Sequence, residues 1–138
     1  MYLLDTNVIS EMRKTHKGKG SKAVADWLAT TNPQSLYTSA VVMMELERGV
    51  LAMERKDPIQ GAMLRRWKTT AERTLFAGRI LPIDETTARI CARLHIPDKA
   101  PENDAWIAAT AMQRGLKLAT RNIKDFRHDG LQAFDPFA

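Results

Sequence analysis

The sequence has a single cysteine, Cys91, so no disulfide can form within the chain. A lone cysteine in an amphipathic segment is typically a buried thiol, and the lack of disulfides is typical of cytoplasmic proteins. No apolar run approaches the roughly 20 residues that span a bilayer. The short apolar start is interrupted by Asp5, unlike a signal peptide. We therefore expect a cytoplasmic protein without a membrane anchor.

The sequence also shows no cluster of soft metal ligands and no phosphate-binding glycine loop. His16 has no histidine or cysteine nearby, and the sequence shows no cluster of these residues that would favour a softer metal such as zinc. The basic segment 13–22 contains two glycines, but their spacing does not match a phosphate loop. We predict a mobile loop there, either solvated or in contact with RNA.

What is present is enough for one domain. The 138 residues are 44% hydrophobic, which suits a single domain over 1–138 with one core. Lysine and arginine number 21 against 16 acids, for a net charge of +5. A basic balance of this size weakly favours polyanionic partners such as nucleic acid.

The spacing of apolar residues predicts alternating strands and helices. We expect strands at 2–4, 35–38, 80–83, 116–120 and 131–134, and helices at 8–12, 23–29, 39–55, 57–76, 84–94 and 102–114. Pro82 suggests that the third strand lies at an edge. This alternation indicates an α/β fold with a mostly parallel sheet covered by helices on both faces.

Asp5 directly follows the first predicted strand and precedes a helix. In open α/β sheets, ligands bind at the carboxyl ends of the strands. Aspartate is also a favoured helix N-cap, so Asp5 alone has two interpretations. The fourth strand is followed in the same way by Thr120, Asn122 and Asp125, for which ordinary turn chemistry is the alternative.

Two further acids lie on predicted helices. At 100° per residue, one broad face of the helix at 39–55 is predicted to pack, and it comprises Val41, Val42, Leu46, Gly49, Ala52 and Met53. Glu45 falls inside that face, whereas Glu47 points to the opposite, polar side. A carboxylate on a packing face is costly unless it has a partner, although Glu45 could also reach solvent at the edge of the stripe. The helix at 102–114 is apolar almost all round, so we expect it to be central and buried. Asp104 lies in its first turn, where it either interacts with the helix dipole or meets a cation.

If these acids converge, a hard cation is the natural counter-charge. Clustered carboxylates repel one another and raise one another's pKa values. Oxygen ligands alone favour Mg²⁺, which usually retains several waters. Sequence does not prove the convergence of Asp5, Glu45, Asp104 and Asp125, so a metal-free binding protein remains an alternative.

Four segments together resemble the PIN domain family, and more narrowly VapC- or FitB-type toxins of bacterial toxin–antitoxin pairs. They are Leu3-Leu4-Asp5-Thr6-Asn7-Val8-Ile9-Ser10, the stretch from Thr38 through Glu45 to Gly49, Asn103-Asp104-Ala105-Trp106-Ile107-Ala108-Ala109-Thr110-Ala111, and Thr120-Arg121-Asn122 through Asp125-Phe126. They occur in the family's order and cover nearly the whole chain.

The resemblance implies a three-layer α/β/α fold and cleavage of RNA with Mg²⁺ or Mn²⁺. By position it implies an acidic site of Asp5, Glu45, Asp104 and Asp125, with Thr6 and Asn122 supporting it through hydrogen bonds. We expect Asp5, Asp104 and Asp125 to hold the metal, and Glu45 to bind metal or orient the attacking water.

The resemblance also implies a homodimer and a cognate antitoxin that often binds DNA. Three other functions compete with this hypothesis. An aspartyl-nucleophile phosphatase would need an aspartate two residues after Asp5, where this chain has Asn7. A structure-specific DNA nuclease needs more chain for an arch or clamp. A non-catalytic regulator, which acts only by binding a partner, remains an alternative if the four acids fail to converge.

The predicted helices at 39–55 and 57–76 carry more apolar surface than one small core needs, notably Met43, Met44, Leu51 and Trp67. We therefore expect a homodimer, and an antitoxin segment that packs in a nearby groove as a helix or an extended strand.

Overall fold

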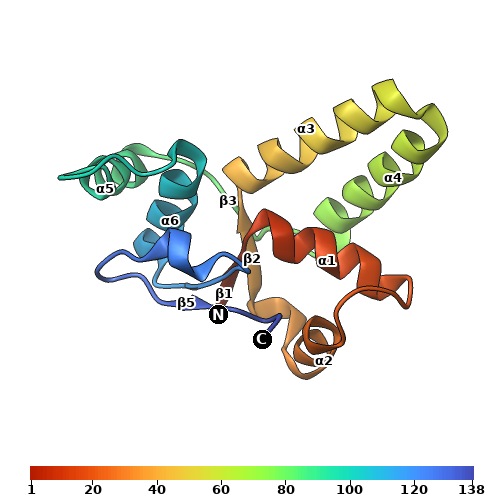
Figure 1. Ribbon diagram of the computed structural model, residues 1–138, viewed down its shortest axis with the longest axis horizontal. Coiled ribbons are helices and arrows are strands. Elements are labelled where there is room, and N and C mark those ends of the chain that lie inside the picture. Colours follow the sequence, from red (N-terminus) through yellow and green to blue (C-terminus); the bar gives the residue numbers. More distant parts are fainter.

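A five-stranded parallel sheet lies at the centre of the computed structural model, which describes residues 1–138 (Figure 1). The strands are β1 Tyr2–Leu4, β2 Leu36–Ser39, β3 Ile80–Leu81, β4 Lys117–Ala119 and β5 Ala133–Phe134. Their order is β3-β2-β1-β4-β5, and every neighbouring pair is parallel. The expectation that β3 lies at an edge is confirmed. Tyr2 is aligned with Leu36 on one side and with Lys117 on the other.

Six α-helices connect and cover these strands. They are α1 Thr6–His16, α2 Lys22–Thr30, α3 Ala40–Lys56, α4 Pro58–Thr74, α5 Glu85–Leu94 and α6 Glu102–Arg114, with short 3-10 turns η1 Pro33–Ser35 and η2 Ile123–Phe126. In Figure 1, α1 and α2 lie on one side of the sheet, α5 and α6 lie on the other, and α3 and α4 form a projecting hairpin. The predicted α/β/α architecture is confirmed. No helix has the length and apolarity that a bilayer span requires.

The first helix is longer than the sequence suggested. The helix was expected to end at residue 12 and a loop to fill 13–22, but α1 continues to His16. Its last turn is basic, which suits the negative end of the helix dipole. The loop that remains is closed by Glu11, which accepts a hydrogen bond from the Ser21 amide at 2.6 Å. At Gly20, with φ +83°, an added Cβ would lie 2.5 Å from the Glu11 carboxylate, so the turn requires glycine.

The buried face of α3 also differs from the helical-phase prediction. Val41 and Val42 are buried as expected, but Gly49 and Ala52 are exposed and Val50 is buried instead. The cause is α4, which packs along the second half of α3 and changes which side is covered. The two helices approach so closely that a Cβ on Gly61 would lie 2.4 Å from the Glu54 Cα atom.

The core lies between the sheet and the helices beside it. Leu3 and Leu4 of β1, together with Val8 and Ile9 of α1, have no exposed surface. Helix α6 buries four alanines, at 105, 108, 109 and 111, and their small side chains allow the helix to lie close to the rest of the fold. The prediction of a central, buried helix at 102–114 is confirmed. Truncating a core leucine such as Leu3 to alanine typically costs about 2–5 kcal/mol of stability.

The strand order reverses direction between β1 and β4, because the chain adds β2 and β3 on one side of β1 and returns to add β4 on the other. A reversal of this kind leaves a crevice at the carboxyl ends of the two strands, where ligands commonly bind in α/β proteins. Asp5 follows β1 and Thr120 follows β4 at this position.

Candidate active site at the carboxyl edge of the sheet

Asp5 is fixed at the crevice by three hydrogen bonds. Its Oδ1 accepts from the Thr6 backbone amide at 2.8 Å, and its Oδ2 accepts from the Thr120 hydroxyl at 2.8 Å and the Asn7 amide at 3.3 Å. Asp5 is therefore the N-cap of α1 and also a bridge to β4, so its two interpretations are compatible. Only 5% of the residue is exposed.

Burial raises the pKa of the Asp5 carboxyl, and the nearby charge of Glu45 raises it further. The hydrogen bonds from Thr120, Thr6 and Asn7 oppose this rise, because they stabilise the ionised form. No ion pair in the structure involves Asp5. A buried carboxylate without a cationic partner is unusual in folded proteins.

Glu45 projects from α3 toward the same crevice. Its Oε1 accepts from the Thr6 hydroxyl at 2.5 Å, and its Oε2 accepts from the Asn103 amide at 3.3 Å. Thr6 thus connects Asp5 and Glu45, with its backbone amide on one carboxylate and its hydroxyl on the other. The structure therefore brings Glu45 beside Asp5, and the predicted supporting hydrogen bonds of Thr6 are present.

Asp104 faces these two acids from the first turn of α6. Burial raises the pKa of its carboxyl to about 6, and the charges of Asp5, Glu45 and Asp125 contribute, in that order. The other three acids therefore all lie within electrostatic range of Asp104. The Asp104 side chain is half-exposed and makes no hydrogen bond within the protein.

Asp125 and Asn122 lie in and just before η2, after β4. Asp125 is exposed, and its charge reaches Asp104. The Asn122 backbone amide donates to the Thr120 hydroxyl at 3.1 Å, but the Asn122 side chain makes no hydrogen bond within the protein. A supporting role for the Asn122 side chain therefore stays a prediction.

A family model for the PIN domain matches residues 2–129. The chain belongs to the PIN domain family. It is 32% identical to VapC ribonuclease Y4jK from Sinorhizobium fredii, over 99% of this chain and 98% of that protein. It is 34% identical to toxin FitB from Neisseria gonorrhoeae, over 99% of each chain.

Solved structures agree with this assignment. The crystal structure of FitAcB from Neisseria gonorrhoeae has a TM-score of 0.86 and 34% identity, and covers 99% of this chain and 98% of the other. The structure of FitAB bound to an IR36 DNA fragment has a TM-score of 0.84 and 33% identity, with coverage of 100% and 96%. A toxin–antitoxin complex from Klebsiella pneumoniae has a TM-score of 0.69 and 25% identity, with coverage of 99% and 98%.

Three residues of this PIN domain support the acids in ways that helical phase and strand alternation did not reveal. Asn7 and Thr120 hold Asp5, and Asn103 holds Glu45. The position of Thr120 after β4 was predicted, because it follows that strand as Asp5 follows β1, but its hydrogen bond to Asp5 was not. Asn7 and Asn103 adjoin motif residues, but nothing local distinguishes them from ordinary helix residues.

The acids of this PIN domain do not form a ready-made metal cage. No three side chains of the aspartate, glutamate, histidine or cysteine type stand in metal-ligating positions. Asp5 and Glu45 instead direct their oxygens to Thr6, Thr120 and Asn103. Asp104 and Asp125 are free of protein partners and can turn toward a ligand.

Proposed function

We propose that this PIN domain is a metal-dependent endoribonuclease and the toxin of a toxin–antitoxin pair. Its site would be Asp5, Glu45, Asp104 and Asp125. The observation that carries this proposal is the geometry at Thr6, which donates to both Asp5 and Glu45, with Asp104 near enough that these acids and burial raise the pKa of its carboxyl to about 6. None of the four acids has a cationic partner in the chain, which supports an external cation as their counter-charge.

The donor set fits Mg²⁺ or Mn²⁺. All four acids offer carboxylate oxygens, and no histidine or cysteine stands among them to favour a softer metal. Magnesium often binds through one or two carboxylates and retains several waters, so a closed protein cage is unnecessary. We propose that Asp5, Asp104 and Asp125 hold the ion. The chemistry it supplies is charge stabilisation on the phosphate and acidification of the water nucleophile.

The protein's own contribution is orientation. Thr6 and Asn103 fix both oxygens of Glu45, so this carboxylate is suited to bind metal or to orient the attacking water. Thr120 and the Thr6 amide fix Asp5. Groups fixed before the reaction lose no further freedom in the transition state, which is where positioning contributes to rate.

The ribonuclease proposal also rests on relatives. The curated protein from Sinorhizobium fredii is named a VapC ribonuclease and the one from Neisseria gonorrhoeae a toxin, and each matches this chain over almost its whole length. The similar structures include toxin–antitoxin and DNA-bound complexes. We therefore propose RNA as the substrate and a DNA-binding antitoxin as a partner.

A groove beside Glu45 suits a segment of that antitoxin. A cavity of about 190 Å³ between α1, α3 and α4 is lined by Thr6, Ser10, Glu45, Leu46, Gly49, Val50, Leu64, Trp67 and Lys68. Its apolar wall and the adjoining carboxylate fit an amphipathic peptide with a basic residue. A helix or extended strand seated there would block access to Glu45.

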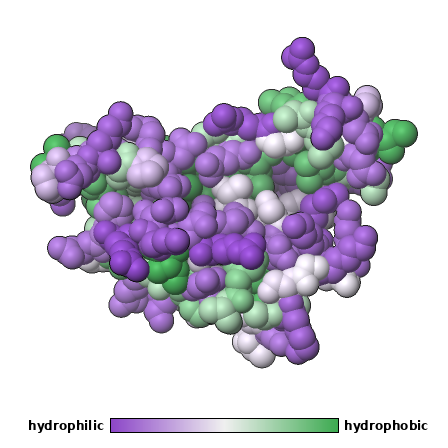
Figure 2. All heavy atoms as spheres, viewed as in Figure 1, coloured by the Kyte–Doolittle hydropathy of each residue, from purple (hydrophilic) through white to green (hydrophobic).

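The outer end of the α3–α4 hairpin supports the proposal of a homodimer. Hydrophobic residues gather there in Figure 2, and Leu51, Ile59 and Met63 are 54%, 75% and 43% exposed. Of the four residues expected at this surface, Met44 and Leu51 are exposed, but Met43 and Trp67 pack against the core. Exposed apolar patches on small proteins often mark interfaces. Light scattering should show a dimer that Leu51→Glu disrupts and Arg55→Glu, an exposed control on the same helix, does not.

Cleavage of single-stranded RNA by the purified chain tests the function. We expect fragments in Mg²⁺ or Mn²⁺, no fragments in excess chelator, and restored cleavage when metal is returned. Single-stranded DNA of the same sequence is the matched substrate. Equal cleavage of RNA and DNA would favour a DNA nuclease, and no cleavage of either with unchanged melting in metal would favour a non-catalytic partner protein.

A further inference from the structure

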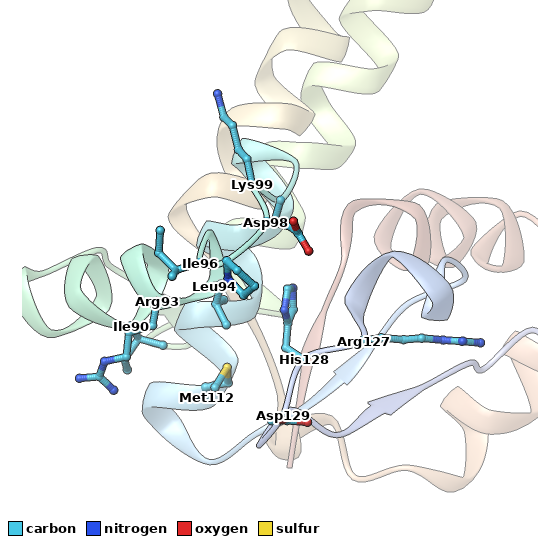
Figure 3. Close-up of a pocket in the computed structure, with 12 residues that line it drawn as sticks. Ile90, Arg93, Leu94, Ile96, Asp98, Lys99, Met112, Arg127, His128 and Asp129 are labelled. Carbon is cyan, nitrogen blue, oxygen red and sulfur yellow. The ribbon is translucent and has the colours of Figure 1, made fainter.

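The largest cavity of the molecule lies outside the four acids and has no role so far. Its volume is about 660 Å³, and it opens between the loop 95–101 and the loop 127–130 (Figure 3). The first loop leads into α6, which carries Asp104, and the second begins two residues after Asp125. Because consecutive Cα atoms are about 3.8 Å apart, the Cα atoms of Arg127 and Asp125 lie within about 8 Å of each other, so the second wall starts close to the candidate active site.

The inner surface of this cavity combines apolar atoms with two polar groups. Leu94, Ile96 and Met112 provide apolar atoms from α5, the loop and α6. Figure 3 shows the His128 ring and the Asp98 carboxylate pointing toward the same space. Neither group forms an ion pair within the protein.

The His128 side chain has an unsatisfied polar atom in this region. Its Nε2 atom is buried and has no hydrogen-bond partner. A buried polar nitrogen without a partner is uncommon in folded proteins and requires an explanation. A ligand group in the cavity that hydrogen-bonds to this nitrogen would supply one.

The cavity walls are held in place. The Ala100 amide donates to His95 Nδ1 at 3.1 Å, which closes the loop that carries Asp98. On the other wall, the Leu131 amide donates to the His128 carbonyl at 3.1 Å. The two polar groups are therefore presented from restrained loops, as a binding pocket requires.

Charge at the rim indicates a ligand with phosphates. Arg93, Lys99 and Arg127 line the cavity, and in Figure 3 their side chains extend outward from it. Three cations at the mouth would meet phosphates outside the cavity, while an uncharged part of the ligand enters it. A nucleotide combines such parts, because its flat base is uncharged and its phosphate is charged. Proteins commonly read unpaired RNA bases by stacking, including on histidine, and by hydrogen bonds to the base edges.

We propose that this cavity binds an unpaired RNA base next to the cleaved bond, with guanine preferred. Asp98 accepts hydrogen bonds from the base edge, and guanine offers two adjacent donors, N1–H and the N2 amino group, to one carboxylate. Uracil offers a single N–H there. His128 contacts the ring through its unpartnered nitrogen. The inference rests on the proposed ribonuclease function and adds a base preference to it.

Titration of the full chain with guanosine 5′-monophosphate, followed by NMR of the histidine rings, tests the cavity without cleavage. The chain has three histidines, and the variant His128→Asn identifies the His128 signal. We expect that signal to move with guanosine monophosphate at concentrations roughly tenfold or more below those needed with uridine monophosphate, as for a bidentate base contact. Asp98→Asn should remove this difference. Asp129→Asn, which removes the same charge from the same cavity, should retain it.

Cleavage of an RNA with one randomised position on each side of the cut gives the second readout. The wild type should favour guanine at one of these positions, and Asp98→Asn should lose that preference. The cavity assignment would be overturned if neither nucleotide shifts the His128 signal, or if wild type and Asp98→Asn have the same base preference. Cleavage of the RNA in those experiments would still support the ribonuclease proposal. Nucleotide binding without any RNA cleavage would uphold the pocket and overturn the ribonuclease.

Discussion

Glu45 and Glu47 are identical side chains two residues apart on α3, yet they have opposite environments. Glu47 forms ion pairs with Arg65 at 2.6 Å and Lys68 at 3.3 Å. The hydrogen bond from Arg65 is the main cause that lowers the pKa of the Glu47 carboxyl. Glu45 receives only neutral donors, from Thr6 and Asn103, and contributes to the raised pKa values of Asp5 and Asp104.

Glu47 thus belongs to a group of acids that the fold pairs with basic residues, whereas Glu45 belongs to a group of acids without such partners. On the Glu47 side, Arg65 also pairs with Glu54 and Lys68 with Glu72, so each of these acids has a basic partner, and the pairs of Glu47 and Glu54 join α3 to α4. On the Glu45 side, four acids share a crevice without one basic partner. A fold tolerates such an imbalance where an external cation or a substrate completes the site.

The largest expected effect is on cleavage. Glu45→Gln and Asp5→Asn should each lower kcat for RNA by roughly a hundredfold or more, the range typical for removal of a catalytic acid–base group. Both replacements preserve shape, and asparagine is as good an N-cap as aspartate, so folding should survive. Glu47→Gln is the matched control and should cleave like the wild type. Full activity of the Asp5→Asn variant would show that Asp5 serves only as the N-cap of α1.

Thr6→Val should lower activity less than loss of Glu45. It removes the hydroxyl that donates to Glu45 at 2.5 Å but leaves the backbone amide that donates to Asp5 at 2.8 Å. Since small misplacements of a catalytic group can cost up to about a hundredfold, we expect roughly a tenfold loss in kcat with little change in KM. Thr6→Ser should restore most of the rate. A change confined to KM would contradict a positioning role.

Asp104 should make the metal-free protein less stable as the pH rises. Its pKa is about 6 in the folded chain and 3.8 as a free side chain, so the folded state holds the proton more tightly. Stability from this group is therefore full below pH 3.8 and falls as the pH rises to about 6. Asp104→Asn should melt at a higher temperature than the wild type at pH 7 without metal, and the gap should close toward pH 4. A lower melting temperature at pH 7 would contradict the repulsion.

Glu47→Gln should have the smallest effect. Its side chain is 36% exposed, and exposed ion pairs contribute little to stability. We expect the melting temperature to change by less than about 2 °C in moderate salt, because surface substitutions rarely cost more. Calorimetric melting of the variant beside the wild type measures this. A much larger drop would show that the network with Arg65 and Lys68 is needed to hold the hairpin.

Local patterns predicted the parallel sheet, its edge strands and five of the six helices closely, because strand and helix periodicities are carried by neighbouring residues. They missed the last turn of α1, and they misjudged the outer half of α3, where Val50 is buried by α4 rather than by the sheet. Pairing between α3 and α4 is a tertiary contact, which helical phase within α3 does not contain.

The site residues also divide into those that local sequence indicates and those that depend on tertiary contacts. Position after a strand pointed to Asp5 and Thr120, and phase pointed to Glu45, but the hydrogen bond of Thr6 to Glu45 joins residues 39 positions apart. The bond of Thr120 to Asp5 spans 115 positions. Contacts of that range depend on the strand order β2-β1-β4, which local sequence does not specify.

The central claim is that the unneutralised acids are a cation site, and direct Mn²⁺ binding to the RNA-free protein tests it best. Free Mn²⁺ can be counted by its paramagnetic resonance signal in titrations of wild type, Asp104→Asn and Glu47→Gln at pH 7.5. We predict that Asp104→Asn binds at least roughly tenfold more weakly than the wild type, a loss of about 1.4 kcal/mol, and that Glu47→Gln binds equally well. Equal binding by wild type and Asp104→Asn, or equal weakening in both variants, would contradict the account.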